Sequence, residues 1–204
     1  MNPYPSRSKW QADYSHLALT VKRPISNTSQ GLDLDEADNN PYANSEGFYP
    51  LLATLVDFPF PTIALITGHT FGGAGPFALS HDYRIMNSKR GFISMPPVNL
   101  GLHFPGIGAL PRLKLQPQVA RKMLLEAHRW TGEQALQDGI VDAIADPDRM
   151  FEVAMEKARA VAPKAKMGVW SLLRNELYGD AGRHFREISY IHGRRVGSAA
   201  KAKI

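Results

Sequence analysis

A short apolar run followed at once by a glycine-rich turn constrains the fold of this chain more than any other feature. The run, Thr62–Ile66, is continuous and of strand length, which is typical of a strand covered on both faces. Four glycines then lie between Gly68 and Gly75. Pro76 follows them and is tolerated in the first turn of a helix, where its missing N–H would have had no partner. The segment therefore predicts a buried strand, a glycine-rich turn and a helix over Gly73–Ser80.

A turn of this kind places backbone N–H groups at the positive end of a helix, where they stabilise a phosphate or a developing oxyanion. The glycines match neither the phosphate loop that ends in Gly-Lys-Ser/Thr nor the Gly-x-Gly-x-x-Gly pattern of dinucleotide sites. No serine stands at the elbow, which excludes a hydrolase nucleophile there. Glycines after a strand also serve close packing alone. An anion site and a purely structural turn both remain open at this point.

The rest of the chain reads as strands and helices early and helices only beyond Pro111, which predicts an α/β core with a C-terminal helical layer. Asn44 or Ser45 caps a predicted helix over Glu46–Val56. On that helix, one side carries Leu51, Leu52, Leu55 and Val56. The other predicted elements are an edge strand over His16–Lys22, strands over Asp82–Met86 and Gly91–Met95, and helices over Pro117–His128, Gly132–Asp138, Asp148–Val161 and Lys166–Tyr178.

Composition narrows the class of protein. The chain has 204 residues and is 44% hydrophobic, enough for one medium domain with a sizeable core. It contains no cysteine, which excludes disulfide scaffolds, thiolate zinc sites and cysteine nucleophiles. Proline and glycine interrupt the longest apolar stretch, Phe58–Phe71, and the first residues are polar. We therefore expect a soluble intracellular protein that does not span a membrane.

Positive charge gathers near the C-terminus. The net charge is +5, and Lys164–Ile204 carries 9 basic and 3 acidic side chains. Such a stretch is either a solvated helix face or a surface that attracts a polyanion. Aromatic residues do not alternate with the basic ones as they do in RNA-binding motifs. We therefore expect no nucleic-acid partner.

Four segments in order resemble the crotonase family of enoyl-CoA hydratases and isomerases, and most of all its fungal and plant peroxisomal isomerases. They are Ser29–Leu34, Thr62–Ile85, Gly91–Leu102 and Thr131–Asp142. The resemblance covers roughly residues 29 to 195. It implies a crotonase-like (ClpP/crotonase) spiral core of parallel strands with helices. Residues 1–28 match poorly, 29–163 form the core, and 164–204 form the C-terminal helical region.

The resemblance also assigns a site. The family stabilises an enolate with two backbone N–H groups, which match Leu32 and Gly73 here. Gly31, Asp33 and Gly72 flank them and are predicted to contact substrate, as is Pro97. The family's two catalytic glutamates match Pro76 and Pro97, which cannot titrate. The nearest titratable residue is His103, a proton shuttle or a histidine without chemistry. Asp82 and His69 match structural positions.

This pattern implies an acyl-CoA-metabolising enzyme that favours Δ3,Δ2-enoyl-CoA isomerisation over hydration, because hydration needs both carboxylates. The alternative is a non-catalytic protein that binds CoA esters. Coenzyme A would be part of the substrate, and we expect no other cofactor and no metal. Ala202–Ile204 resembles the Ser-Lys-Leu peroxisomal address. We also expect a homotrimer formed by the C-terminal helices, with apolar residues Trp170, Leu172, Leu173, Leu177, Phe185 and Tyr190.

Overall fold

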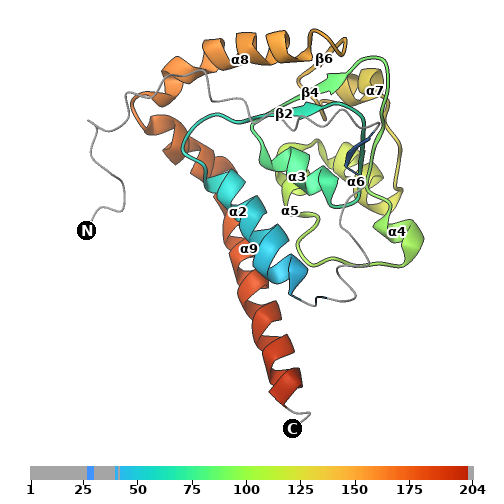
Figure 1. Cartoon of the computed structure of the whole chain (residues 1–204), viewed down its shortest axis with the longest axis vertical. Coiled ribbons are helices and arrows are strands. Elements are labelled where there is room, and N and C mark those ends of the chain that lie inside the picture. The colour runs from blue at the N-terminus through green and yellow to red at the C-terminus, as the bar shows by residue number, and fades with distance from the viewer. Residues whose placement is uncertain (1–26, 30–39, 41, 202–204) are drawn as a thin grey trace.

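The computed structural model describes residues 27–29, 40 and 42–201, with backbone alone for 27–29 and 190–201. It is an α/β molecule whose last helix, α9, extends away from the body (Figure 1). None of the described helices is long and apolar enough to cross a bilayer. The helices are η3 (Ala43–Phe48, a π-helix), α2 (Tyr49–Asp57), α3 (Ala74–Ser80), α4 (Pro97–Leu100), α5 (Ala109–Lys114), α6 (Pro117–Leu125), α7 (Gly132–Gln137), α8 (Met150–Ala165) and α9 (Val169–Lys201).

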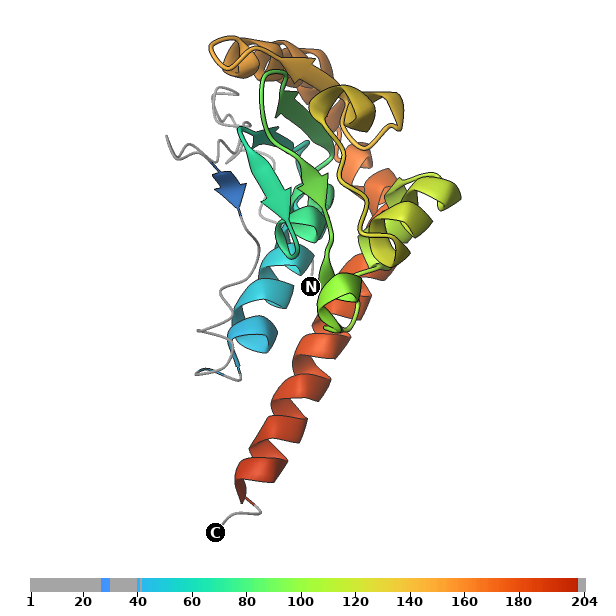
Figure 2. The same cartoon turned by 90° about the vertical axis from the view of Figure 1, so that its right-hand side faces the viewer.

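Within the described residues, six short strands form two parallel sheets (Figure 2). One sheet has the order β2-β4-β6, and the other has the order β1-β3-β5. Every neighbouring pair is parallel; Ile63 lies opposite Tyr83, for example, and Thr70 opposite Ile93. Parallel sheets between helices confirm the predicted fold class. The strands are β1 (Asn27–Ser29), β2 (Ile63–Ile66), β3 (His69–Phe71), β4 (Tyr83–Asn87), β5 (Ile93–Ser94) and β6 (Ala143–Ala145).

Strand β2 is buried on both faces, as its continuous apolar sequence predicts. Ile63 and Leu65 belong to a cluster with α8. Ile66, which points the other way, belongs to the larger cluster that includes Met86, Trp130 and Phe185. The sheet β2-β4-β6 thus separates two apolar layers, and α3 follows it within the larger one.

Helix α9 runs beside α2 in both views (Figures 1 and 2), and one arginine joins them. The guanidinium of Arg174 donates to the carbonyls of Val56 at 2.6 Å and Phe60 at 3.3 Å, and also to those of Leu55 and Phe58. Carbonyls at a helix end lack partners within the helix. Arg174 therefore completes the carboxyl end of α2 from a distant part of the chain.

Asp82 balances the charge of Arg174: its Oδ1 lies 3.1 Å from Nε of Arg174. Its Oδ2 accepts a hydrogen bond from the Thr62 N–H at 2.7 Å. Both charged side chains are less than 10% exposed. The structural role expected for Asp82 is confirmed. Its carboxylate fixes the start of β2 relative to β4 and α9.

Several predicted boundaries were wrong. A π-helical segment, Ala43–Phe48, precedes α2 where one continuous helix was expected, and Leu51 is 46% exposed instead of packed with its neighbours. The prediction of helices only beyond Pro111 was wrong, because β6 pairs with β4. Residues of the predicted strand His16–Lys22 lie outside the described part. Helix α9 continues to Lys201, well past the expected end. Helix α8 ends at Ala165, just beyond the boundary that we placed after residue 163.

The glycine-rich turn differs from its prediction as well. We expected the glycines to follow β2 directly, but His69–Phe71 first forms β3 in the other sheet. Only Thr70 is fully buried in that strand, between two half-exposed aromatic rings. This period of two is the signature of a half-buried strand. It carries the chain from one sheet to the other immediately before α3.

Candidate functional site

The amino end of α3 presents a backbone donor, as the sequence predicted. Gly73 is the N-cap of α3, with φ −59°, and its carbonyl accepts from the Phe77 N–H at 3.2 Å. Among the described residues, no acceptor lies against the N–H of Gly73. The residue is buried. A buried amide at a helix N-terminus is placed to stabilise negative charge.

The neighbouring glycines shape the turn. Gly72 has φ +55°, which favours glycine, and its N–H donates to the Ser94 carbonyl at 3.1 Å. A Cβ added to Gly75 would lie 3.0 Å from Cγ of Met95. Both interpretations of the glycines therefore apply, at different positions: Gly75 allows close packing of α3, and Gly73 offers a free donor.

A narrow apolar cleft lies at Gly73. Its volume is about 10 Å³, space for about one water molecule. Four aromatic rings and two aliphatic side chains dominate its wall, so the site excludes water and favours an apolar group. The lining residues are Phe48, Tyr49, Leu52, Gly73, Pro76, Phe104, Ile107 and Phe185.

Tyr49 is the lining residue with a polar side chain. Its hydroxyl donates to the Pro105 carbonyl at 2.7 Å, and its ring stacks on Phe185 with centroids 6.1 Å apart. Burial raises the pKa of Tyr49 to about 12, so the hydroxyl keeps its proton at neutral pH. The hydrogen bond also ties the 101–108 loop to α2. The cleft is thereby closed on its loop side.

The predicted acid–base positions lie in different surroundings. Pro76 is buried in α3 and lines the cleft, whereas Pro97 begins α4 and is half-buried. His103 is exposed in the turn after α4 and is not among the residues that line the cleft. The wall of the cleft thus contains Gly73 and Pro76, and neither Pro97 nor His103 is part of it. Leu32, Gly31 and Asp33 lie outside the described residues.

The carboxyl end of α3 is held by two cations. Lys114 Nζ donates to the His81 carbonyl at 2.8 Å, and Arg84 Nη1 donates to the same oxygen at 2.9 Å. Lys114 also lies 4.2 Å from the centroid of the Tyr178 ring. Burial lowers the pKa of Lys114 to about 7. Cations at a helix C-terminus stabilise the helix dipole, so both ends of α3 have defined electrostatic surroundings.

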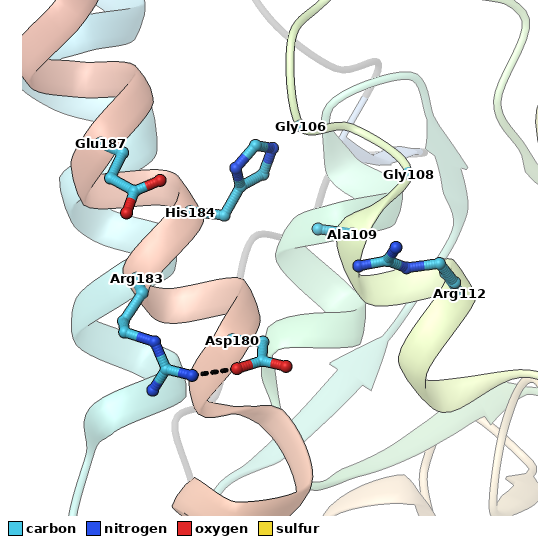
Figure 3. A pocket seen from close by; sticks show the side chains of 8 residues that line it. All are labelled: Gly106, Gly108, Ala109, Arg112, Asp180, Arg183, His184 and Glu187. Atoms are coloured by element: carbon cyan, nitrogen blue, oxygen red, sulfur yellow. Dashed lines mark hydrogen bonds and ion pairs between the residues drawn. The ribbon is translucent and has the colours of Figure 1, made fainter.

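A second, larger cavity lies between α5 and α9 (Figure 3). Its volume is about 590 Å³, and its walls carry charges of both signs. Arg183 pairs with Asp180, while Arg112 projects from α5 toward α9. Gly106 and Gly108 line this cavity, and Ile107 between them lines the apolar cleft. The 106–108 segment therefore separates an open polar groove from the closed cleft at Gly73.

Sequence reasoning missed the cleft wall. Tyr49, Phe104, Ile107 and Phe185 come from different segments, and only the fold assembles them. Of these residues, only Tyr49 lies in a helix that the sequence predicted, just before the apolar residues of α2. The burial of Lys114 was not predicted, because nothing in the sequence around it distinguishes a buried lysine from a solvated one.

These features define the class of the protein. Two parallel sheets, a helix that starts at a glycine amide and a C-terminal helical part together form a crotonase fold. The solved structure of an enoyl-CoA isomerase from Mycobacterium tuberculosis shares this fold, with a TM-score of 0.77 at 23% identity over 87% of this chain and 78% of that one.

The chain belongs to the enoyl-CoA hydratase/isomerase family, whose sequence model matches residues 27–178. It is 37% identical over 147 residues to the peroxisomal enoyl-CoA delta isomerase 2 of Arabidopsis thaliana, covering 70% of this chain and 61% of the relative. It is 36% identical over 143 residues to delta isomerase 3 of the same plant, covering 68% and 60%. The chain thus spans about three fifths of the length of these relatives.

Proposed function

We propose that this chain binds an acyl-CoA thioester and acts as an enoyl-CoA isomerase of the Δ3,Δ2 type. The observation that carries the proposal is the buried Gly73 amide, which has no acceptor among the described residues and borders an apolar cleft. A thioester oxygen at that amide would gain charge as an enolate forms, and α3 would stabilise it. The apolar wall suits a hydrocarbon chain.

Isomerisation fits the site better than hydration. Hydration in this family uses two carboxylates, and prolines stand at both matching positions. Isomerisation needs one group that moves a proton within the substrate. We propose His103 for this role, which requires the 101–108 loop to bring its imidazole toward the cleft. Leu32 would supply the second backbone donor, with Gly31, Asp33, Gly72 and Pro97 around the bound thioester.

A matched pair of variants tests the proposal. Gly73→Val places a branched side chain at the oxyanion position, and we expect isomerase activity to fall about a hundredfold or more. Gly47→Val makes the same change in η3, where an added Cβ meets nothing within 4 Å, and should retain activity. Activity is measured with a 3-enoyl-CoA, and thermal unfolding confirms that both variants fold. Equal activity in the two variants would contradict the role of Gly73.

The cleft also favours a second candidate, a protein that binds CoA esters without turning them over. The observation behind it is that Pro76 occupies the cleft wall where the family's hydratases carry a carboxylate. Calorimetry with butyryl-CoA separates the candidates. Binding without any conversion of 3-enoyl-CoA, by wild type and by His103→Ala alike, would favour the binding protein.

A further inference from the structure

The cleft at Gly73 is closed, and one part of its wall is held less firmly than the rest. Its volume of about 10 Å³ leaves room for about one water molecule, too little for an acyl group. Leu52 and Phe185 in the wall are 1% and 0% exposed and belong to the main apolar cluster. Close packing of this kind resists displacement. An acyl group at Gly73 therefore requires another part of the wall to move.

That part is the segment 102–105, which contributes Phe104 to the wall. Phe104 is half-buried, and the other residues of the segment are exposed. Ile107 packs against the main apolar cluster, whereas Phe104 belongs to neither apolar cluster of the described residues. Gly101 and Gly106 lie at the two ends of the segment with φ of +65° and +77°, conformations that favour glycine. The segment thus has few anchors and a conformationally free residue at each end.

One side-chain hydrogen bond holds the segment closed. The Tyr49 hydroxyl donates to the Pro105 carbonyl at 2.7 Å. Among the described residues, it is the one hydrogen bond that joins 102–105 to a residue outside 97–107. Gly106, by contrast, lies against α9, because a Cβ added there would be 3.2 Å from Cδ2 of His184 (Figure 3). Movement of the segment would therefore pivot at Gly106 and break the bond from Tyr49.

We propose that residues 102–105 form a gate over the cleft and that Tyr49 is its latch, a positioning residue that acts through the Pro105 carbonyl. In the open state the bond from Tyr49 is broken and Phe104 leaves the wall, which makes room for an acyl group beside Gly73. The inference rests on the thioester binding proposed above and adds how the acyl group enters. Because the acyl group occupies the space that Phe104 leaves, the bound state is the open state.

The strength of one hydrogen bond sets the size of the effect. Pro105 is exposed, so water can replace the Tyr49 hydroxyl at its carbonyl when the gate opens. A hydrogen bond that is exchanged for water in this way favours the closed state by about two- to tenfold. The apparent affinity of a ligand that binds the open state alone is reduced in proportion to the open fraction. Loss of the latch should therefore raise the open fraction and strengthen acyl-CoA binding by the same factor.

A thiol reporter measures gate opening without any ligand. The chain has no cysteine, so Pro76→Cys places a single thiol in the buried wall of the cleft. Tyr49→Phe removes the hydroxyl and keeps the ring that stacks on Phe185. We expect Pro76→Cys to react with iodoacetamide about two- to tenfold faster when Tyr49→Phe is also present. Tyr83→Phe, which removes a hydroxyl from β4, is the matched control and should leave the rate unchanged.

A second reporter distinguishes gate opening from a general loosening of the fold. Ala135→Cys, at a fully buried residue of the main apolar cluster, should react at the same rate with and without Tyr49→Phe. Hydrogen exchange at the Gly73 amide gives a further readout in the cysteine-free chain, which does not depend on the folding of Pro76→Cys, and should accelerate with Tyr49→Phe. Unchanged rates at both Pro76→Cys and the Gly73 amide, or equal acceleration at Ala135→Cys, would overturn the gate.

Calorimetry with butyryl-CoA separates the failure of this inference from that of the proposed function. The Kd should be about two- to tenfold lower for Tyr49→Phe than for wild type. Binding with the same Kd in both proteins would overturn the link between the gate and the acyl group and leave thioester binding intact. Absence of binding to both proteins would overturn the proposed function, and with it the entry of an acyl group through the gate.

Discussion

The charge of Lys114 is coupled to the fold. Its ammonium is removed from water yet bonded to the His81 carbonyl, and burial lowers its pKa to about 7. Between pH 7 and the ordinary lysine value, the unfolded chain holds a proton that the folded chain lacks. The free energy of unfolding therefore rises with pH in that window. Below pH 7 both states hold the proton, and the burial penalty is fully present.

We predict that Lys114→Met flattens this pH dependence. Thermal unfolding of wild type should shift upward between pH 6 and pH 9, since each tenfold change in proton affinity corresponds to about 1.4 kcal/mol. One kcal/mol moves Tm by about 2–4 °C in a chain of this size. Lys164→Met, on the exposed end of α8, is the control and should retain the wild-type slope. An unchanged slope in Lys114→Met would disprove the assignment.

His81 makes the free energy of unfolding depend on pH in a second, more acidic range. Burial lowers its pKa to about 4, and its Nδ1–H donates to the Phe77 carbonyl at 3.0 Å. Stability linked to His81 is therefore complete above the ordinary histidine value and falls as the pH drops toward 4. Together the two residues make the carboxyl end of α3 sensitive to acid.

At the scale of elements, α2 and α9 depend on each other through Arg174. Four carbonyls around the end of α2 accept from one guanidinium, whose charge Asp82 balances. The guanidinium of arginine offers five N–H donors spread over a planar fork, whereas the ammonium of lysine offers three on a single nitrogen. Removing Arg174 takes the counter-charge from the buried carboxylate of Asp82 and a charged donor from the carbonyls at the end of α2.

We predict that Arg174→Met lowers the free energy of unfolding by about 3–5 kcal/mol and that Arg174→Lys recovers only part of the loss. Arg183→Met breaks the exposed pair with Asp180 and should cost less than about 1 kcal/mol. Urea denaturation measures all three. Similar losses for Arg174→Met and Arg183→Met would contradict the role given to the buried network.

The elements found by sequence are those with local signals. A continuous apolar run predicts strand β2. Glycines followed by a proline that the first helical turn tolerates predict the start of helix α3. The length of α9 was missed because Gly179 and Gly182 lower helix propensity. Tertiary contact explains the second glycine: a Cβ at Gly182 would lie 3.0 Å from Asp57 of α2. Likewise, Gly73 could be predicted from its neighbours, whereas the wall formed by Tyr49, Ile107 and Phe185 exists only in the folded chain.

For the whole molecule, α9 leaves an apolar stripe exposed. Leu173 and Leu177 lie one turn apart and are 55% and 62% exposed, and Leu172 is 65% exposed. Phe185, which we expected at a subunit interface, is instead fully buried in its own chain. The side chain of Tyr190 lies outside the described residues.

We predict a homotrimer in which this stripe is covered by other copies of the chain. Light scattering should return a trimer for wild type at micromolar concentration. Leu173→Glu combined with Leu177→Glu should yield a monomer, because charges on a buried face oppose association. Leu125→Glu is the control: Leu125 lies on α6 and is 67% exposed, and this variant should remain a trimer. A wild-type monomer would refute the prediction.

We also predict import into peroxisomes through Ala202–Ile204, which lies outside the described residues. The name of one plant relative places that protein in the peroxisome. A fluorescent reporter that carries the last twelve residues should appear in peroxisomes, and removal of the tripeptide should abolish import. A diffuse cytosolic signal from the intact reporter would rule out this address.

The link between Arg174 and the end of α2 has a consequence for biosynthesis. During synthesis, residues 55–60 emerge from the ribosome more than a hundred positions before Arg174, whose side chain bonds their carbonyls. Until Arg174 emerges, the nascent chain holds an unfinished helix end beside an apolar strand, the kind of surface that chaperones bind. We therefore expect the carboxyl end of α2 to be completed only after Arg174 has left the ribosome.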